Sequence, residues 1–212
     1  ASRYSEGRVY AAFDNHRNGD FKPYLFVSED AGETWSAISS GIPEFHTLHV
    51  VREHHRNADL LFAGTERGLF VSFDRGQRWN KFGAPLPTVP IDDIQVHVRE
   101  NDLILGTHGR SIWILDDITF LEQLAEAQKS DAYLFTPRTK VAFRVSSKKG
   151  FTGSKFFYGQ NPAAGAIVQY YLSKSPGDKE PFSIMVFEKG GKEPIAQIRG
   201  LSSEVGYNRV FW

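Results

Sequence analysis

Two copies of one phrase, SEDAGETW at residues 28–35 and SFDRGQRW at residues 72–79, decide the fold of this chain. The copies begin 44 residues apart, and a short apolar run precedes each of them. An apolar run that leads into a polar phrase with a glycine is typical of a strand entering a tight turn. The repeat therefore predicts a fold built from successive hairpins.

Four positions of each copy carry this prediction: a serine, an aspartate, a glycine and a tryptophan. We expect the aspartate to accept hydrogen bonds from its own turn and the glycine to take a positive φ. The tryptophan is expected to fold back as a hydrophobic plug. The residues with predicted structural roles are Ser28, Asp30, Gly32, Trp35, Ser72, Asp74, Gly76 and Trp79.

This pattern resembles the Asp-box, or BNR repeat, of the β-propellers in sialidases, xyloglucanases and sortilin-type receptors. The first copy matches at every defined position, and the second departs at Arg78, where the repeat has threonine. Because the box occurs in enzymes, receptors and assembly factors alike, the resemblance implies a fold and not one chemistry.

When the chain is aligned by the spacing of the repeat, it divides into three related units. Each has two strands joined by a turn, and alternating segments between the units predict further strands, which gives about four strands to a propeller blade. The third unit keeps Asp117 and lacks the glycine and the tryptophan of the box. The predicted strands are residues 8–13, 23–28, 47–52, 60–65, 69–72, 94–99, 103–107 and 111–117.

A closed propeller needs about four to eight blades, and this chain supplies about three. We expect the remaining blades to come from the same precursor or from another chain. Past the blades, Thr119 as N-cap and Glu122 three residues later predict a short helix with a capping box. Spaced strands with Pro-Gly-Asp and Gly-Gly-Lys turns then predict an incomplete β-sandwich.

The predicted fold class is therefore all-β. Residues 1–118 are assigned to the C-terminal blades of an Asp-box β-propeller, residues 119–130 to a helical connector, and residues 131–212 to a truncated, immunoglobulin-like β-sandwich.

A narrower resemblance covers nearly the whole chain. The phrases at 20–24, 63–68, 107–110, 113–117 and 161–166 look like those of large bacterial sortilin-like, BNR-repeat propeller proteins that are often labelled glycosyl hydrolase. The resemblance implies the C-terminal part of such a propeller followed by an immunoglobulin-like module, with a periplasmic or extracellular location.

Composition narrows the possible partners. The chain has 25 basic and 25 acidic residues and no long basic run, so we expect no nucleic-acid partner and no membrane insertion. Cysteine is absent, which rules out disulfides and cysteine-ligated metal. We expect no cofactor and no metal.

Residues for catalysis are not recognisable as motifs. A glycosidase needs two carboxylates at a defined separation, but the paired acids 92–93 and 116–117 are adjacent and point to opposite faces of a strand. No Gly-x-Ser-x-Gly elbow occurs either. The favoured function is a non-catalytic binding or scaffolding module for a protein or glycan; the alternative is a fragment of a sialidase- or xyloglucanase-like hydrolase with its acids mainly outside this chain.

The candidate ligand-binding residues lie where the repeat breaks. His108 and Arg110 occupy the turn that is equivalent to Glu66 and Arg67 in the second unit, and equivalent turns gather on one rim of a propeller. A histidine and an arginine there suit an anionic or polar ligand. A structural alternative stays open, in which His108 caps its turn and Arg110 pairs with Asp116 or Asp117.

The other histidines and a group of aromatic residues have simpler interpretations. His54 and His55 are expected in a solvated turn, while His49 and His97 are expected at matching structural positions of two strands. Aromatic residues within 151–158 either pack between the two domains, which we favour, or form a binding platform.

Overall fold

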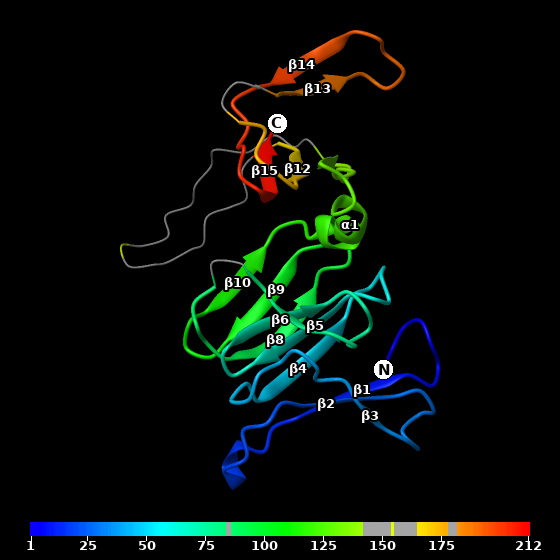
Figure 1. Cartoon of the computed structure of the whole chain (residues 1–212), viewed down its shortest axis with the longest axis vertical. Helices are drawn as coiled ribbons and strands as arrows, with labels where there is room; N and C mark the ends of the chain where they lie inside the picture. The colour runs from blue at the N-terminus through cyan, green and yellow to red at the C-terminus, as the bar shows by residue number, and fades with distance from the viewer. Residues whose placement is uncertain (84–85, 142–153, 155–164, 178–181) are drawn as a thin grey trace. The chain divides into compact units, whose positions relative to one another are not determined.

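The structure is a computed structural model that describes residues 1–83, 86–141, 154, 165–177 and 182–212 (Figure 1). The all-β prediction is confirmed, because the described residues form fifteen strands, one short α-helix and one 3-10 turn. The chain divides into two compact units, Ala1–Glu122 and Gln123–Trp212. Their border falls inside helix α1 (Thr119–Ala127), and the aromatic group predicted at 151–158 lies outside the described residues, apart from residue 154.

Three antiparallel sheets make up the first unit, as expected for part of a propeller, and they follow one another through the unit (Figure 1). We call them blades 1, 2 and 3. Blade 1 contains β1 (Val9–Phe13), β2 (Tyr24–Ser28) and β3 (Ser36–Ala37), with the 3-10 turn η1 (His16–Asn18) between β1 and β2. Blade 2 contains β4 (Leu48–Glu53), β5 (Leu61–Thr65), β6 (Gly68–Ser72) and β7 (Asn80–Lys81). Blade 3 contains β8 (Ile91–Val96), β9 (Leu103–Thr107) and β10 (Ile112–Leu115).

The registers show which residues of two blades are equivalent. Val9 of β1 pairs with Ser28, and Leu61 of β5 pairs with Ser72, so each strand meets the serine that opens its Asp-box. Blade 2 adds β4 on the other edge of β5, whereas β1 pairs only with β2 in the described residues. Blade 2 is therefore the one described blade with four strands.

A hydrophobic core lies between blades 1 and 2. Leu25 and Ile42 of blade 1 pack with Leu61, Phe70 and Trp79 of blade 2. Leu25 and Leu61 are fully buried, and Trp79 is 2% exposed. Burial of these side chains stabilises the stack by roughly 2 kcal/mol for each large side chain.

Both Asp-boxes form the same turn. In the first, the Asp30 carboxylate accepts hydrogen bonds from the Thr34 N–H (2.8 Å), the Thr34 hydroxyl (2.5 Å) and the Ser28 hydroxyl (2.7 Å). The Ser28 oxygen in turn accepts the Gly32 N–H at 2.8 Å. Gly32 has a φ of 100°, which a residue with a Cβ rarely adopts.

The second box repeats this pattern closely. The Asp74 carboxylate accepts the Arg78 N–H at 2.9 Å and the Ser72 hydroxyl at 2.7 Å, and the Ser72 oxygen accepts the Gly76 N–H at 2.8 Å. Residue 78 needs no hydroxyl for the bond from its backbone, which explains why arginine is compatible with the turn.

The third blade ends differently. Leu115 occupies the position of the box serine, so the bond between a serine hydroxyl and the aspartate is absent there. The Asp117 carboxylate instead accepts the N–H (3.2 Å) and the hydroxyl of Thr119, the first residue of α1.

The prediction of Thr119 as N-cap is therefore wrong, because Asp117 bonds the first turn of the helix in its place. Glu122, predicted to complete the capping box, contacts Arg56 and Asn101 instead.

Strand β8 begins earlier than predicted. The alternation at 94–99 placed the strand there, but β8 is Ile91–Val96, and Val98 is 58% exposed in the turn that follows. Leu48 pairs with Thr65 and Ile91 pairs with Thr107, so His49 is equivalent to Asp92 and not to His97. The predicted match of His49 with His97 is wrong, because tertiary pairing and not local alternation sets the register.

The second unit has two antiparallel sheets, consistent with part of a sandwich. One contains β11 (Ala132–Leu134), β12 (Ile167–Leu172) and β15 (Gly206–Phe211), and the other is the hairpin of β13 (Ile184–Phe187) and β14 (Pro194–Ile198). The immunoglobulin-like assignment stays a prediction. Within the described residues, no helix has the length and apolar character needed to span a membrane.

Candidate functional site

The turn between β5 and β6 carries two of the predicted ligand-binding residues. Thr65 closes this turn, because its hydroxyl donates to the Gly68 carbonyl (2.8 Å) and accepts the Arg67 N–H (3.2 Å). The Glu66 N–H donates to the Thr47 carbonyl at 2.9 Å. The turn therefore holds the backbone of Glu66 and Arg67 firmly while their side chains extend into solvent.

The equivalent turn of blade 3 carries the other two. The Thr107 hydroxyl donates to the Ser111 carbonyl at 2.6 Å, in the same role as that of Thr65. The His108 N–H donates to the Pro90 carbonyl at 3.0 Å, and its side chain is 80% exposed. Arg110 is exposed and forms no ion pair with any described residue, so the predicted pairing with Asp116 or Asp117 is not seen in this part of the chain.

An acid and a histidine face each other at this turn in both blades, with their positions exchanged. In blade 2, the His49 Nε2 lies 3.0 Å from a Glu66 carboxylate oxygen. In blade 3, the His108 Nδ1 lies 3.3 Å from the Asp92 carboxylate. Since His49 is equivalent to Asp92 and Glu66 to His108, the two blades use the same pair in reverse. Sequence reasoning missed this exchange because it aligned His49 with His97.

Blade 1 also places an acid beside histidines at this end of its strands. Asp14, which follows β1, lies 2.6 Å from the His16 ring and 4.0 Å from the His49 Nδ1. Burial by itself would raise the pKa of Asp14, but hydrogen bonds from His16 and the charges of His16 and His49 outweigh it and lower the pKa. The loops after β1, β5 and β9 therefore lie on one side of the stack. We call this side the rim and define it by residues 14–23, 66–67 and 108–111.

A pocket of about 350 Å³ opens beside Arg67 on the rim. Its walls combine two cations, Arg67 and Lys81, with apolar groups, and the Phe82 N–H donates to the Leu69 carbonyl. Neither cation forms an ion pair with a described residue. The pocket is lined by Arg67, Gly68, Leu69, Lys81, Phe82, Gly83, Leu86, Pro87 and Thr88.

This pocket connects the two predicted turns. Thr88 lines it, and Pro90, two residues further, accepts the His108 N–H. Arg67 and His108 therefore flank one loop between blades 2 and 3. An exposed histidine and two cations without ion partners suit an anionic ligand that also carries apolar groups.

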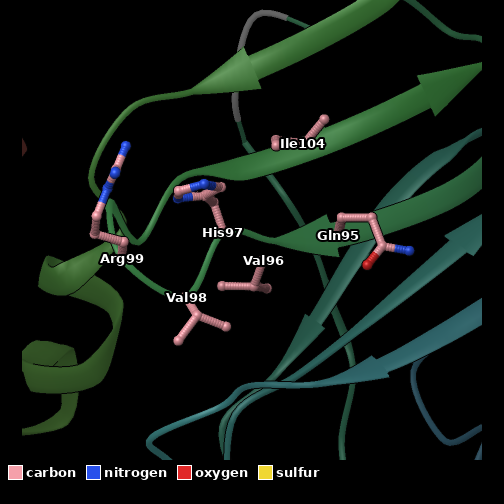
Figure 2. A pocket seen from close by; sticks show the side chains of 6 residues that line it. All are labelled: Gln95, Val96, His97, Val98, Arg99 and Ile104. Atoms are coloured by element: carbon pink, nitrogen blue, oxygen red, sulfur yellow. The ribbon is translucent and has the colours of Figure 1, made fainter.

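A second hollow of about 500 Å³ lies at the far end of β8 and β9 (Figure 2). It is lined by Gln95, Val96, His97, Val98, Arg99 and Ile104. Arg99 pairs with Glu100 at 2.7 Å, and the His97 Nδ1 accepts the Glu100 N–H at 3.0 Å. Its charged group is thus already paired within the loop, which makes it a poorer site for an anion than the pocket at Arg67.

His54 does not lie in a solvated turn. Its side chain is fully buried, its Nδ1 accepts the Arg56 N–H (3.2 Å), and its Nε2 lies 3.0 Å from the Asn101 amide oxygen. The proton must then sit on Nε2, so the imidazole is neutral and donates to Asn101. Burial lowers the pKa of His54 against the opposing Asn101 hydrogen bond and Glu122 charge.

Carboxylate pairs that a hydrolase would use have other contacts. Asp92 faces His108, and Asp93 accepts a hydrogen bond from Arg52 at 3.0 Å. Asp117 binds the first turn of α1. Within the described residues, no group of three or more histidine, aspartate or glutamate side chains has the geometry of a metal site.

Comparison with known proteins identifies the family. The Sortilin-Vps10 family, described as "Sortilin, neurotensin receptor 3", matches residues 24–149, more than half of the chain. This chain belongs to the Sortilin-Vps10 family. The resemblance to sortilin-like propellers is thereby confirmed, whereas a bacterial origin and the glycosyl hydrolase label find no support in the relatives.

The relatives are fungal proteins named vacuolar protein sorting/targeting protein 10. The one from Pyrenophora tritici-repentis is 22% identical over 174 residues, which is 81% of this chain and 11% of the relative. The one from Colletotrichum graminicola is 30% identical over 136 residues, which is 62% of this chain and 9% of the relative. The chain thus spans about a tenth of the length of the Sortilin-Vps10 proteins that it matches.

Proposed function

We propose that this chain is a non-catalytic, protein-binding part of a sorting receptor of the Sortilin-Vps10 type, located on the periplasmic, extracellular or lumenal side of a membrane. The names of the fungal relatives and the receptor in the family's description support a sorting role. Three of the four paired acids that the rival hydrolase would use, Asp92, Asp93 and Asp117, have structural contacts, which favours binding over catalysis. The ligand contacts the rim.

The observation that carries this proposal is the pocket at Arg67. Its two cations have no ion partner among the described residues, and they stand beside the partly exposed Phe82 and Leu86. Two unpaired cations beside apolar groups favour a peptide with alternating acidic and aliphatic side chains over a neutral glycan. Arg110 and the exposed His108 extend the same surface along the rim.

A binding measurement with charge-reversal variants tests the proposal. We expect the chain to bind a short fluorescent peptide of alternating glutamate and leucine, and not one of alternating lysine and leucine. The variants Arg67→Glu and Lys81→Glu should each weaken binding about 3- to 10-fold, since an exposed ion pair contributes about 0.2–1 kcal/mol and reversal adds repulsion. The exposed Lys192→Glu in the second unit is the matched control and should leave binding unchanged.

Three results would contradict the proposal. Equal binding of both peptides would show that charge at the rim does not select the ligand. Binding of a neutral oligosaccharide in place of the acidic peptide would assign a glycan ligand. Release of reducing sugar from a polysaccharide would make the chain part of a hydrolase.

A further inference from the structure

Blade 1 carries two exposed phenylalanines at the rim. Phe21 lies in the loop after β1 and is 43% exposed, and Phe45 lies in the loop between blades 1 and 2 and is 55% exposed. Their ring centroids are 5.9 Å apart, and the Phe45 N–H donates to the Phe21 carbonyl at 3.1 Å. A backbone hydrogen bond thus joins the two loops and holds two aromatic rings together in solvent. We call these two residues the Phe21/Phe45 pair.

The backbone of Phe45 is strained. Its φ is 63°, a value that a bulky residue rarely adopts. Burial does not offset this strain, since the residue is more than half exposed. Strained residues of this kind gather at positions that contact ligands.

The loop that holds Phe21 has a counterpart in blade 2. Residues 14–23 join β1 to β2, as residues 66–67 join β5 to β6. Arg67 of that shorter turn lines the pocket of about 350 Å³. Phe21 therefore belongs to the loop that corresponds to the turn with Arg67.

Phe45 corresponds to another residue of the same pocket. The Thr47 carbonyl, between blades 1 and 2, and the Pro90 carbonyl, between blades 2 and 3, each accept an N–H from the rim turn of the following blade. Phe45 and Thr88 lie two residues before these carbonyls, and Thr88 lines the pocket. The Phe21/Phe45 pair therefore stands in blade 1 where the pocket opens in blade 2.

The two equivalent places differ in charge. Lys81 of the pocket pairs with Phe70, and its counterpart in blade 1 is Ala37, which pairs with Phe26. Where blade 2 presents Arg67 and Lys81, blade 1 presents two aromatic rings and an alanine. The pocket thus suits an acidic side chain, whereas the Phe21/Phe45 pair suits an aromatic one, because aromatic rings associate edge to face or offset.

Charges beside the pair fit a ligand that is acidic elsewhere along its length. Arg17 and Lys22, in the same loop as Phe21, are exposed and form no ion pair with any described residue. Glu44, next to Phe45, is also exposed, which disfavours an acidic side chain directly on the rings. An uncharged ring followed by acidic residues therefore matches this part of the rim.

We propose that the Phe21/Phe45 pair is a second subsite of the rim, which takes an aromatic side chain of the acidic peptide that binds at Arg67 and Lys81. This inference rests on the proposed function and adds an aromatic anchor to its ligand. The strained backbone of Phe45 keeps its ring exposed for that contact. The peptide then extends from the pair in blade 1 to the pocket in blade 2.

Two fluorescent peptides test this inference. Both contain alternating glutamate and leucine, and one carries a phenylalanine at each end where the other carries a serine. The peptide with phenylalanine ends should bind this chain about 5- to 10-fold more tightly. Phe45→Asn and Phe21→Ala should remove this advantage, so that both peptides bind these variants with equal affinity. Phe187→Ala, which changes an exposed phenylalanine of the second unit, is the matched control and should keep the advantage.

The stability of Phe45→Asn separates a binding role from a structural one. Asparagine adopts a positive φ more readily than phenylalanine does, and the lost ring is exposed. The free energy of unfolding in urea should therefore not fall. A pair that only joins two loops would give the opposite result, with lower stability and an undiminished preference for the peptide with phenylalanine ends, and the inference would be wrong.

The same measurements distinguish failure of this inference from failure of the proposed function. Equal binding of the two peptides to the unchanged chain, with Arg67→Glu weakening both, would overturn the inference and leave the proposed function standing. Binding of neither peptide would refute the proposed function and the inference with it. A neutral oligosaccharide that binds the chain and loses its affinity in Phe45→Asn would make the pair a glycan platform, which also contradicts the inference.

Discussion

The two Asp-boxes share their turn and differ in the place of their tryptophan. Trp79 is 2% exposed and donates to the Ile38 carbonyl of the neighbouring blade, whereas Trp35 is 44% exposed and donates to Gly32 in its own turn. In each turn, the serine that opens the box accepts the glycine N–H at the same distance, 2.8 Å, for both Ser28 and Ser72. The comparison teaches that the turn is a local structure, while the tryptophan takes its place from the blade beside it.

The largest effect is expected from removing the two tryptophans. In this chain, Trp79→Ala should lower the free energy of unfolding by about 3–5 kcal/mol, because it leaves a cavity in the core between blades 1 and 2. Trp35→Ala should lower it by roughly 1 kcal/mol or less, as an exposed side chain does. Urea denaturation followed by circular dichroism measures both. Equal losses would show that the two tryptophans are buried alike, and the comparison would fail.

A smaller and more even effect is expected from the serines that open the boxes. Ser72 is fully buried and Ser28 is 1% exposed, and each accepts a glycine N–H at 2.8 Å. Ser72→Ala and Ser28→Ala should each cost about 1–3 kcal/mol, because a buried N–H loses its acceptor. The same denaturation experiment applies, with Ser202→Ala in the second unit as an exposed control. Very different losses would mean that the turn also depends on the blade around it.

The smallest effect on stability is expected from lowering the pH. Hydrogen bonds from the Thr34 hydroxyl, from the Thr34 N–H and from Ser28 lower the pKa of Asp30 to about 2 from an ordinary value of 3.8. A carboxylate whose pKa falls on folding stabilises the folded state above its unfolded pKa. This stabilisation is therefore present above about pH 4 and is lost as the pH falls toward about 2.

Residue 34, which is threonine in the first box where the second has arginine, tests the cause of the lowered pKa of Asp30. Thr34→Arg gives the first box the residue of the second, removes the hydroxyl donor, and should raise the pKa of Asp30. A carboxyl titration by NMR measures the shift, and Ser36→Ala is a neighbouring exposed control. An unchanged pKa would show that the hydroxyl does not hold the carboxylate in its charged form.

Much of the fold was predictable from local patterns. Alternation of apolar residues predicted β4, and the repeated units predicted β5 and β9, each within about one residue of its bounds. The same reasoning failed at β8, where Val96 and Val98 continue the alternation beyond the last paired residue. Alternation reports which residues are suited to a strand, whereas pairing with β9 decides where the strand ends.

The candidate site was predictable only in part. The break in the repeat pointed to Glu66, Arg67, His108 and Arg110, which lie in equivalent turns of adjacent blades. Lys81 was missed, because it comes from the far end of blade 2 and meets Arg67 only through the pairing of β6 with β7. The prediction of a solvated turn for His54 failed for the same reason. His54 is buried where it contacts Asn101, which lies 47 residues away in the sequence.

By itself, the sequence determined the turns. A serine, an aspartate and a glycine within five residues supply most of the hydrogen bonds of one loop. One N–H in each loop, of Ala31 or Arg75, donates to a carbonyl outside it, of Gly7 or Asp59. Only the tertiary structure decided that Trp79 is buried and Trp35 exposed, that His49 faces Glu66 while Asp92 faces His108, and that Lys81 joins Arg67. Hydrogen bonds within a turn depend on neighbouring residues, whereas burial and charge pairing depend on which strand lies alongside, and the sequence of one blade does not contain that information.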